Sequence, residues 1–362
     1  MKKEFQNYLE KIEKIINDSL PEKTNPQWQQ ISFGTAIDEC VSDAHISMLT
    51  NPCKYLISLG GKRWRPLLLV LCAEMTVQAK SANESAAKNR MELAFNLTPL
   101  VEFAHTASLI HDDIEDSAES RRGKPCSHIT FGIDTAINAA AWLYFEATSV
   151  IQKQKLSFEE KTILYELFLT EMRILHLGQA MDIKWHKSPS LIPTKNEYFA
   201  MVKNKTGTLA RLAAKIGIFA GGGTFSEMEK GGIIAQEIGV GFQILDDVTN
   251  IKTGNQGKNR GDDIVEGKKS LPVLIHLEKN PNDKEYISKL FDKARVEGIN
   301  SSSIEEAVSL LLSSGAVSEA EKIGFELVFS KSRELSRFFG KETKSGNLIL
   351  ELFDSMYEFP AK

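Results

Sequence analysis

The sequence has few of the residues that build disulfide or zinc frameworks. Only four cysteines occur in 362 residues, and they form no CxxC pair: Cys40, Cys53, Cys72 and Cys126. No histidine lies at a spacing from them that suits a zinc site. We therefore expect free, buried thiols in a reducing compartment and not a disulfide-stapled secreted fold.

An excess of one charge and long apolar runs are also missing. Lys and Arg number 44 against 48 Asp and Glu, so no basic excess points to a nucleic-acid partner. The N-terminal stretch "MKKEFQNYLEKIEKIINDSL" is amphipathic and contains acids, which argues against a signal or transit peptide. Later apolar windows are broken by charges such as Asp134 and Arg211, which argues against a membrane anchor. We expect a cytoplasmic protein.

Strand signals are scarce, whereas apolar residues recur every three or four positions. This helical spacing is seen, for example, at Leu164, Leu167, Phe168, Met172 and Leu175. No internal repeat or low-complexity linker divides the chain. The pattern predicts one all-α domain over residues 51–362, with a helical extension over residues 1–50 packed on it. Further helices are predicted for residues 285–358, and in the part rich in Ser, Glu and Lys, residues 300–345, we identify no chemistry.

One short stretch, "IHDDIEDSAESRRGKP" at 110–125, concentrates acids beside two arginines. On a helix Asp112 and Asp116 lie one turn apart on one face, and Asp113 lies about 100° around. Like charges at this spacing repel unless a cation bridges them. Oxygen ligands without His or Cys suit Mg²⁺, which shares phosphate oxygens of a substrate. A solvated acidic helix face remains the alternative for this motif alone.

A second acidic cluster follows the first about 130 residues later in the sequence. In "GFQILDDVTN" at 241–250, Asp246 and Asp247 end an apolar helical run, and Asn250 stands where a third aspartate would fit. Gln243 projects toward the same region one turn earlier. Two such clusters facing each other would form a mouth able to hold several Mg²⁺ ions and a diphosphate.

Four basic clusters flank apolar helical sequence, and together they look like phosphate clamps. No glycine-rich P-loop is present, so phosphate binding would depend on side chains and metal. The clusters are Lys62, Arg63 and Arg65 in "GGKRWRP", Arg121 and Arg122 in "RRG", Lys205 with Thr206 in "KTG", and Lys268 with Lys269 in "EGKKSLP".

Over residues 55–277 the chain resembles the trans-prenyl diphosphate synthase family. The motifs "GGKRWRP", "HTASLIHDDIED", "RRGKP", "GQAMDI", "KTG", "GFQILDD" and "EGKKSLP" follow in the family's order. The resemblance implies a bundle of long helices around a deep apolar pocket, the isoprenoid synthase fold. It also implies a Mg²⁺-dependent prenyltransferase of isoprenoid biosynthesis, which adds isopentenyl diphosphate to dimethylallyl, geranyl or farnesyl diphosphate.

The family's site residues carry over to matching positions. The resemblance implies that Asp112, Asp113 and Asp116 ligate two Mg²⁺ and Asp246 a third, with support from Asp247 and Gln243. It implies an allylic diphosphate clamp of Arg121, Lys205 and Lys268, with Thr206, Gln179 and Asp182 beside the reacting carbons or the metal. It implies that isopentenyl diphosphate binds Lys62, Arg65, His105 and Arg122. An ambiguous alignment over 254–269 leaves Lys258, Asp262 and Asp263 as further candidates.

Product length depends on the side chains below the first aspartate. Ala104, Ala107 and Ser108 are all small, so we expect the prenyl tail to pass them; at a rise of 1.5 Å per residue, 107 and 108 lie roughly 6–8 Å below Asp112. The sequence around them is most similar to eukaryotic-type geranylgeranyl diphosphate synthases. That resemblance implies a pocket floor at Tyr144 and Phe145 and tolerance of Asn250. Ordinary core aromatics remain the alternative for this pair.

Three other functions stay open at this point: a longer-chain polyprenyl diphosphate synthase, a terpene cyclase and a non-catalytic subunit of a heteromeric synthase. A cyclase has no need for an isopentenyl diphosphate clamp, and a non-catalytic subunit would be expected to have lost metal ligands. Trp64 replaces the smaller apolar residue usual in the family's first motif. Family members are usually homodimers, so we expect a homodimer.

Overall fold

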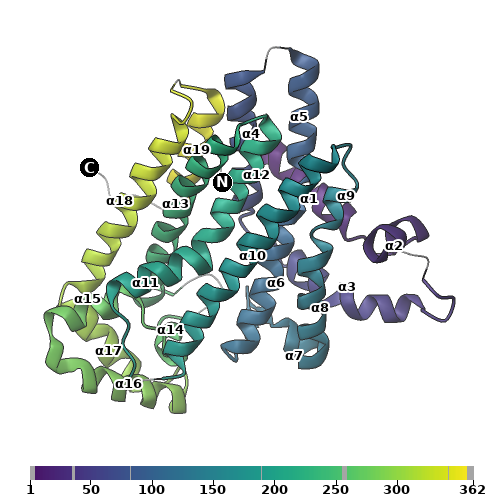
Figure 1. Ribbon diagram of the computed structural model, residues 1–362. Coiled ribbons are helices and arrows are strands. Elements are labelled where there is room, and N and C mark those ends of the chain that lie inside the picture. The colour runs from purple at the N-terminus through teal and green to yellow at the C-terminus, as the bar shows by residue number, and fades with distance from the viewer. Residues whose placement is uncertain are drawn as a thin grey trace.

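The computed structural model describes residues 5–34, 37–81, 83–188, 190–254, 259–340 and 342–356, and most of them lie in helices (Figure 1). The only strands in these ranges are β1 (Ser120–Arg121) and β2 (Lys124–Pro125), which pair antiparallel. The predicted all-α class is confirmed.

The helices fall into three runs along the chain. The first run is α1 (Gln6–Ser19), α2 (Pro26–Phe33), α3 (Asp43–Ser58), α4 (Trp64–Lys80) and α5 (Glu84–Asn96). The second is α6 (Thr98–Glu115), α7 (Ser127–Phe131), α8 (Ile133–Glu146), α9 (Ser149–Gln152), α10 (Phe158–His186), α11 (Lys195–Val202), the π-helical turn η2 (Lys203–Gly207), α12 (Thr208–Gly221) and α13 (Phe225–Lys252). The third is α14 (Asp262–Glu266), α15 (Leu271–Lys279), the 3₁₀ turn η3 (Pro281–Asp283), α16 (Lys284–Glu297), α17 (Ser302–Ser313), α18 (Ala316–Ser336) and α19 (Lys344–Asp354).

The two longest helices begin at capping boxes that the sequence encodes locally. Ser157 accepts a hydrogen bond from the backbone N–H of Glu160 at the start of α10, and the Glu160 carboxylate accepts one from the Ser157 N–H. Thr224 and Glu227 exchange the same pair of bonds at the start of α13. Each box satisfies two backbone donors that a helix start leaves unpaired.

The bundle is built around α12, which packs against α4 on one side and α13 on the other. The backbones of α12 and α4 approach closely, because a Cβ at Gly217 would lie 2.2 Å from the Leu69 carbonyl oxygen. α13 in turn packs along α18, and α6 packs on α8 (Figure 1). This arrangement brings the ends of α6, α10 and α13 to one region of the molecule.

Two apolar clusters make up the interior. The larger one joins α1–α6, α8, α9, α12 and α19, and the smaller one joins α11 and α14–α17; α10, α13 and α18 contribute to both. Ile12 and Ile16 of α1 are fully buried in the larger cluster, so the N-terminal segment is part of the core. The predicted boundary at residue 50 falls inside α3, because one helix runs continuously across it.

A buried carboxyl group lies where α2 meets α8 and α9. The hydroxyls of Ser32 and Ser149 both donate to Oε1 of Glu146, each at 2.9 Å, while Oε2 accepts no hydrogen bond from the described residues. Burial raises the pKa of Glu146 to about 7, against the opposing effect of the two serine hydroxyls. The folded protein therefore holds a proton at Glu146 between about pH 4.5 and 7 that the unfolded chain has lost.

Stability should fall as pH rises through this window, since the unfolded chain gives up the proton first. We predict that Glu146→Gln, which keeps an acceptor for both serines, raises the free energy of unfolding at pH 8 by about 2 kcal/mol. At pH 5, where the folded wild type is protonated, the two proteins should unfold at nearly the same temperature. Thermal unfolding at both pH values checks this, and an equal difference at pH 5 and pH 8 would contradict it.

Candidate active site

The first acidic cluster lies at the C-terminal end of α6, where its three aspartates take different partners. Asp112 faces the cavity described below and accepts hydrogen bonds from Lys205 Nζ at 3.0 Å and Gln179 Nε2 at 3.1 Å. Asp113 is buried, and Oδ1 accepts hydrogen bonds from Arg121, one of them from Nε at 2.9 Å. Asp116 Oδ2 lies 3.2 Å from Lys268 Nζ.

Arg121 and Arg122 are aimed by the short hairpin of β1 and β2. Arg121 pairs with Lys124 in the ladder, and the two turn residues Arg122 and Gly123 have φ of 55° and 75°. Positive φ at both turn positions gives the tight hairpin turn whose twist matches the flanking strands. The hairpin sends Arg121 to Asp113 and leaves Arg122 along the cavity wall.

Lys205 bridges two helices from the π-helical turn. Its Nζ lies 2.6 Å from Asp182 of α10 as well as 3.0 Å from Asp112. The turn fits only because α10 has Gly178 there, where a Cβ would lie 2.3 Å from the Lys205 backbone nitrogen. Burial would lower the pKa of Lys205, but the charges of Asp112 and Asp182 outweigh it and raise the pKa.

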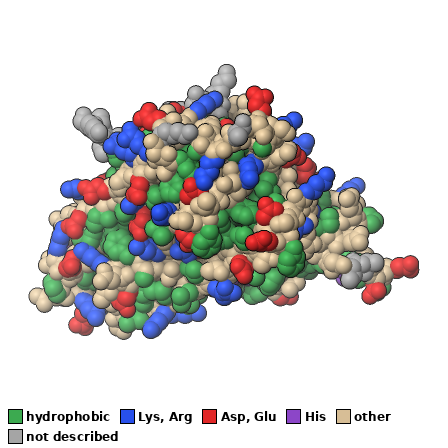
Figure 2. Space-filling view, turned by 45° about the horizontal axis from the view of Figure 1, so that its top comes forward, with side chains coloured by type: hydrophobic (Ala, Val, Ile, Leu, Met, Phe, Trp, Pro, Cys, Tyr) green, Lys and Arg blue, Asp and Glu red, His purple; other side chains and the backbone are tan. Residues whose placement is uncertain are grey.

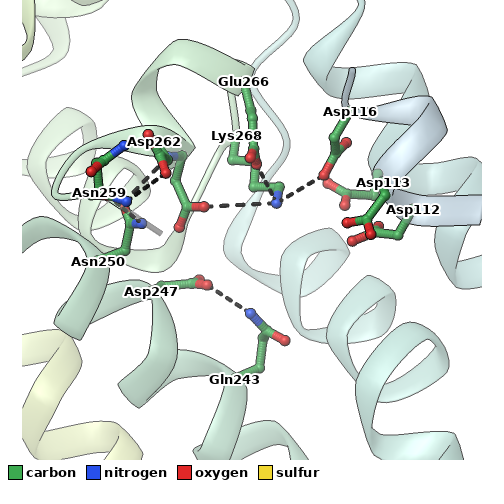
Figure 3. Close-up of polar contacts among 12 residues, drawn as sticks. Asp112, Asp113, Asp116, Gln243, Asp247, Asn250, Asn259, Asp262, Glu266 and Lys268 are labelled. Carbon is green, nitrogen blue, oxygen red and sulfur yellow. Dashed lines mark hydrogen bonds and ion pairs between the residues drawn. The ribbon is translucent and has the colours of Figure 1, made fainter. Parts of the chain in front are cut away.

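The second acidic cluster ends α13 on the opposite side of the opening, so the predicted convergence of the two clusters is confirmed (Figure 3). Asp246 lines the cavity. Asp247 is buried and accepts hydrogen bonds from Tyr198 and Gln243, both at 2.8 Å. Burial is the main cause that raises the pKa of Asp247 to about 8, and the negative charge of the nearby Asp263 adds to it. Gln243 also accepts a hydrogen bond from the Thr206 hydroxyl at 2.8 Å, which ties α13 to the π-helical turn.

Asn250, which stands where a third aspartate would fit in the second acidic cluster, makes hydrogen bonds that hold two segments together. Its Oδ1 accepts the Asp263 backbone N–H at 3.3 Å, and its backbone oxygen accepts that of Gly261 at 3.1 Å. These bonds hold the turn before α14 against α13. Asp262 caps that turn by accepting the Asn259 N–H, whereas Lys258 lies outside the described residues.

Lys268 lies between the two acidic clusters. Its Nζ is 2.5 Å from Glu266, 3.2 Å from Asp116 and 3.7 Å from Asp263 (Figure 3). Burial would lower the pKa of Lys268, but these carboxylates raise it well above its usual range. The neighbouring Lys269 turns away, is buried and donates to the Gly267 carbonyl, so the expected clamp contains one lysine from this motif.

Further basic side chains line the opening at the start of α4 and in the hairpin turn. Lys62, Arg65 and Arg122 line the same cavity as the acidic clusters. His105 Nε2 lies 3.4 Å from the Arg65 guanidinium, and burial followed by the charges of Arg65 and Arg122 lowers its pKa well below the usual range. His105 is therefore neutral at pH 7 and can both donate and accept hydrogen bonds.

The cavity has a volume of about 730 Å³ and continues below the charged rim between apolar side chains. Its lower walls include Leu109 of α6, Leu175 and His176 of α10, Leu209 of α12 and Phe242 of α13. The molecular surface shows apolar side chains gathered between cationic and anionic ones (Figure 2). A charged opening above an apolar interior suits a ligand with an ionic head and a hydrocarbon tail.

The residues predicted to set product length divide into two groups. Ser108 and Tyr144 line the cavity, and the Tyr144 ring lies between those of His111 and His176, with centroids 5.8 and 5.2 Å away. Ala104 and Ala107 are fully buried in the core and do not line the cavity. Phe145 is 72% exposed on the outer face of α8, so its predicted place at the pocket floor is wrong for this chain.

Some residues of the site were missed from sequence. Glu102 is a buried cavity-lining carboxylate, one turn before His105 on α6, and helical spacing from His105 could have indicated it. Glu266 begins a motif that had been noted only for its lysines. No sequence motif indicated Tyr198 or His176, because the packing of α10 and α11 is what brings these side chains to the site.

The acidic side chains of the site can be compared with the ligand set that a cation needs. No three Asp, Glu, His or Cys side chains among the described residues converge tightly enough to hold one ion. However, Asp113 Oδ2 and Asp116 Oδ1 are buried oxygens with no hydrogen bond from the described residues. Mg²⁺ is commonly held by one or two carboxylates together with substrate phosphates and water. The arrangement fits such a shared site and not a cage built by protein alone.

The chain matches known proteins over most of its length. A family profile described as Polyprenyl synthetase covers residues 46–311. Identity is 35% over 264 residues to the geranylgeranyl pyrophosphate synthase dpfgD of Gibberella zeae, covering 72% of this chain and 66% of that relative, just under two thirds. Identity is 34% to dpmpD, a geranylgeranyl pyrophosphate synthase of Macrophomina phaseolina, covering 81% and 83%. The crystal structure of geranylgeranyl pyrophosphate synthetase from Pyrococcus horikoshii superposes with a TM-score of 0.77 at 26% identity, covering 99% and 98%.

Proposed function

The chain belongs to the polyprenyl synthetase family, and on that basis we propose that it joins isopentenyl diphosphate to an allylic diphosphate to make geranylgeranyl diphosphate. One feature carries the proposal: two groups of cations and the carboxylates of both acidic clusters line a single cavity together with apolar side chains. The fungal relatives named above, called geranylgeranyl pyrophosphate synthases, support the twenty-carbon product.

In this proposal the two diphosphates bind on different walls. Arg121, Lys205 and Lys268 hold the allylic diphosphate, since all three side chains line the cavity beside Asp112. Lys62, Arg65 and Arg122 hold isopentenyl diphosphate, and neutral His105 adds a hydrogen bond. Charge-assisted hydrogen bonds to phosphate oxygens are about twice as strong as neutral ones.

The reaction needs no protein nucleophile. The carbon–oxygen bond of the allylic diphosphate breaks, and its electron pair leaves with the diphosphate. The double bond of isopentenyl diphosphate then attacks the allylic cation, so a carbon–carbon bond forms. The resulting cation loses a proton to the departed diphosphate. Lys205, Arg121 and Lys268 stabilise the negative charge that develops on the leaving group, and the apolar lower cavity keeps water from the cation.

Mg²⁺ is proposed as the cofactor, two to three ions for each site. Asp112, Asp113 and Asp116 would hold two of them, and Asp246, supported by Asp247 and Gln243, the third. Bound there, the ions would supply Lewis-acid neutralisation of the diphosphate charge. Burial would raise the pKa of Asp112, but Lys205, Lys268 and Arg121 hold it well below its usual range, so that carboxylate is charged and ready to bind.

The clamp for isopentenyl diphosphate favours elongation over cyclisation. A terpene cyclase ionises an allylic diphosphate but has no second diphosphate to hold, whereas three further cations and His105 also line this cavity. An intact first acidic cluster argues against a non-catalytic subunit. No described helix combines the length and the apolar run that crossing a membrane requires.

The decisive experiment incubates the protein with Mg²⁺, labelled isopentenyl diphosphate and each of three starters: dimethylallyl, geranyl and farnesyl diphosphate. We expect labelled geranylgeranyl diphosphate as the main product, identified by chromatography after dephosphorylation. Longer products would support a polyprenyl synthase instead. Consumption of farnesyl diphosphate without incorporation of label would support a cyclase, and no reaction with any starter would refute the proposal.

A homodimer is proposed through the outer faces of α8 and α10. Exposed apolar side chains gather there: Ile133, Ile137 and Phe145 on α8, and Leu169 and Leu177 on α10. The two helices approach each other where the rings of Tyr144 and His176 lie 5.2 Å apart. Large exposed apolar patches are typical of surfaces that a partner covers.

We predict that Phe145→Glu shifts the protein from dimer to monomer at micromolar concentration, because it would bury a charge in the interface. Light scattering coupled to size-exclusion chromatography measures the mass directly. Val296→Glu, at an exposed valine on α16, serves as the matched control and should leave the mass unchanged. A wild type that elutes as a monomer, or a dimer that survives Phe145→Glu, would contradict this interface.

A further inference from the structure

Arg63 lies at the start of the helix that carries the basic wall, in a backbone conformation that few residues adopt. Its φ is +46°, in the left-handed region, which is strained for a side chain with a Cβ. The side chain is only 3% exposed, although Arg63 borders the cavity together with Lys62 and Arg65. Something in the surrounding structure must hold it there.

Five protein oxygens bind the Arg63 guanidinium, and the weakest of these contacts is from Nη1 to the Gly60 carbonyl at 3.5 Å. Nη1 donates to Glu102 Oε1 at 2.6 Å, and Nη2 donates to the Ile57 carbonyl at 2.8 Å. Nε donates to Glu13 Oε1 at 2.7 Å, and Nη2 also reaches Glu13 Oε2 at 3.4 Å. The bond to Glu13 is therefore a two-point contact, and such contacts with arginine fix orientation as well as distance.

Glu13 comes from α1, fifty positions earlier in the sequence. That helix is firmly seated, because Ile12 and Ile16 on either side of Glu13 are fully buried in the larger cluster. The Tyr8 hydroxyl further donates to Glu74 of α4 at 2.8 Å. The backbone at Glu13 is thus held in place by the core, while the Glu13 side chain is 39% exposed.

The turn that Arg63 holds in place determines the positions of the cations proposed to bind isopentenyl diphosphate. Lys62 precedes Arg63 directly, and Arg65 follows it by two residues; both line the cavity. A Cβ at Gly61 would lie 2.9 Å from Nη2 of Arg122, so the turn also packs on the third cation of the clamp. A shift of the turn would move all three groups relative to one another.

We propose that Glu13 is a positioning residue for the isopentenyl diphosphate clamp, through its two-point contact with Arg63. The inference rests on the proposed function and deepens it, since it gives the N-terminal helix a part in binding one of the two diphosphates. Glu13 touches neither substrate. It sets where the turn of residues 60–63 lies, and so where Lys62, Arg65 and Arg122 meet the phosphate oxygens.

The test measures steady-state kinetics of the full-length Glu13→Gln variant, varying isopentenyl and farnesyl diphosphate separately. We expect KM for isopentenyl diphosphate to rise roughly tenfold, because displacing a positioned group by a fraction of an ångström weakens its contacts. KM for farnesyl diphosphate and kcat should stay within about twofold of wild type, the pattern of lost ground-state binding at one site. Glu102 and the Ile57 carbonyl still hold Arg63, so the variant should fold.

Glu10→Gln is the matched control, since Glu10 lies one turn earlier on α1 and is exposed, and its side chain accepts a hydrogen bond from Gln6 of the same helix. It should leave both KM values unchanged. If Glu13→Gln does not fold, Glu13→Asp, which keeps the charge but is too short for the two-point contact, is measured by the same criteria. Unchanged KM values, or equal rises for both substrates, would overturn the inference. A wild type that does not condense the substrates would instead refute the proposed function itself.

Discussion

Replacing Asp112 by alanine is expected to lower kcat by about a thousandfold or more, equivalent to roughly 4 kcal/mol of transition-state stabilisation. Asp112 is the cavity-facing aspartate of its cluster and the common partner of Lys205 and Gln179. Its loss removes a proposed metal ligand and also releases Lys205, which would then pair with Asp182 alone. Turnover with labelled isopentenyl diphosphate, farnesyl diphosphate and saturating Mg²⁺ measures the effect.

The fold should survive this substitution, because Asp112 lies at the rim and Asp113 keeps its own bond to Arg121. Circular dichroism and thermal unfolding of the variant establish that. Glu119→Gln, which removes one exposed carboxylate from the segment just after the same helix, is the control and should retain wild-type turnover. If Asp112→Ala turned over at the wild-type rate, the proposed role of the first acidic cluster would be lost.

The convergence of the two acidic clusters was predictable because it depends on local periodicity and on motif order. A helix places Asp112 and Asp116 on one side whatever surrounds it. The individual partners were not predictable in this way. The buried bond of Asp113 to Arg121 depends on a six-residue hairpin, and the burial of Asp247 depends on Tyr198 from α11. Spacing along one helix carries no information about either contact.

The residues that line the cavity show a second limit to what the sequence can predict. Counting back from Asp112 gives depth along α6, but not the side of the helix that faces the cavity. His105, Ser108, Leu109 and Asp112 follow each other at three, one and three residues and form one lining face. Ala107 lies about 100° away from Ser108 on the helix and is buried in the core. For the same geometric reason Tyr144 faces inward while its neighbour Phe145 faces outward.

Tyr144 is therefore the residue whose removal should change the product most. Its ring lines the cavity and is held between His111 and His176, so it is a fixed barrier and not a mobile side chain. We predict that Tyr144→Ala extends the main product by at least one five-carbon unit, because the elongating tail can enter the space that the ring leaves. Chromatography of dephosphorylated products from farnesyl and isopentenyl diphosphate measures the shift.

The truncation also costs stability, on the order of 3 kcal/mol for a buried aromatic, so general loosening must be separated from a specific effect on length. Trp142, two residues earlier on α8, provides that comparison: its ring packs against Trp28 and Phe33, and it does not line the cavity. Trp142→Ala should therefore lower the unfolding temperature without lengthening the product. The Tyr144 ring can limit product length only if the growing tail passes it. Equal product distributions for Tyr144→Ala and wild type would therefore mean that the tail takes another path.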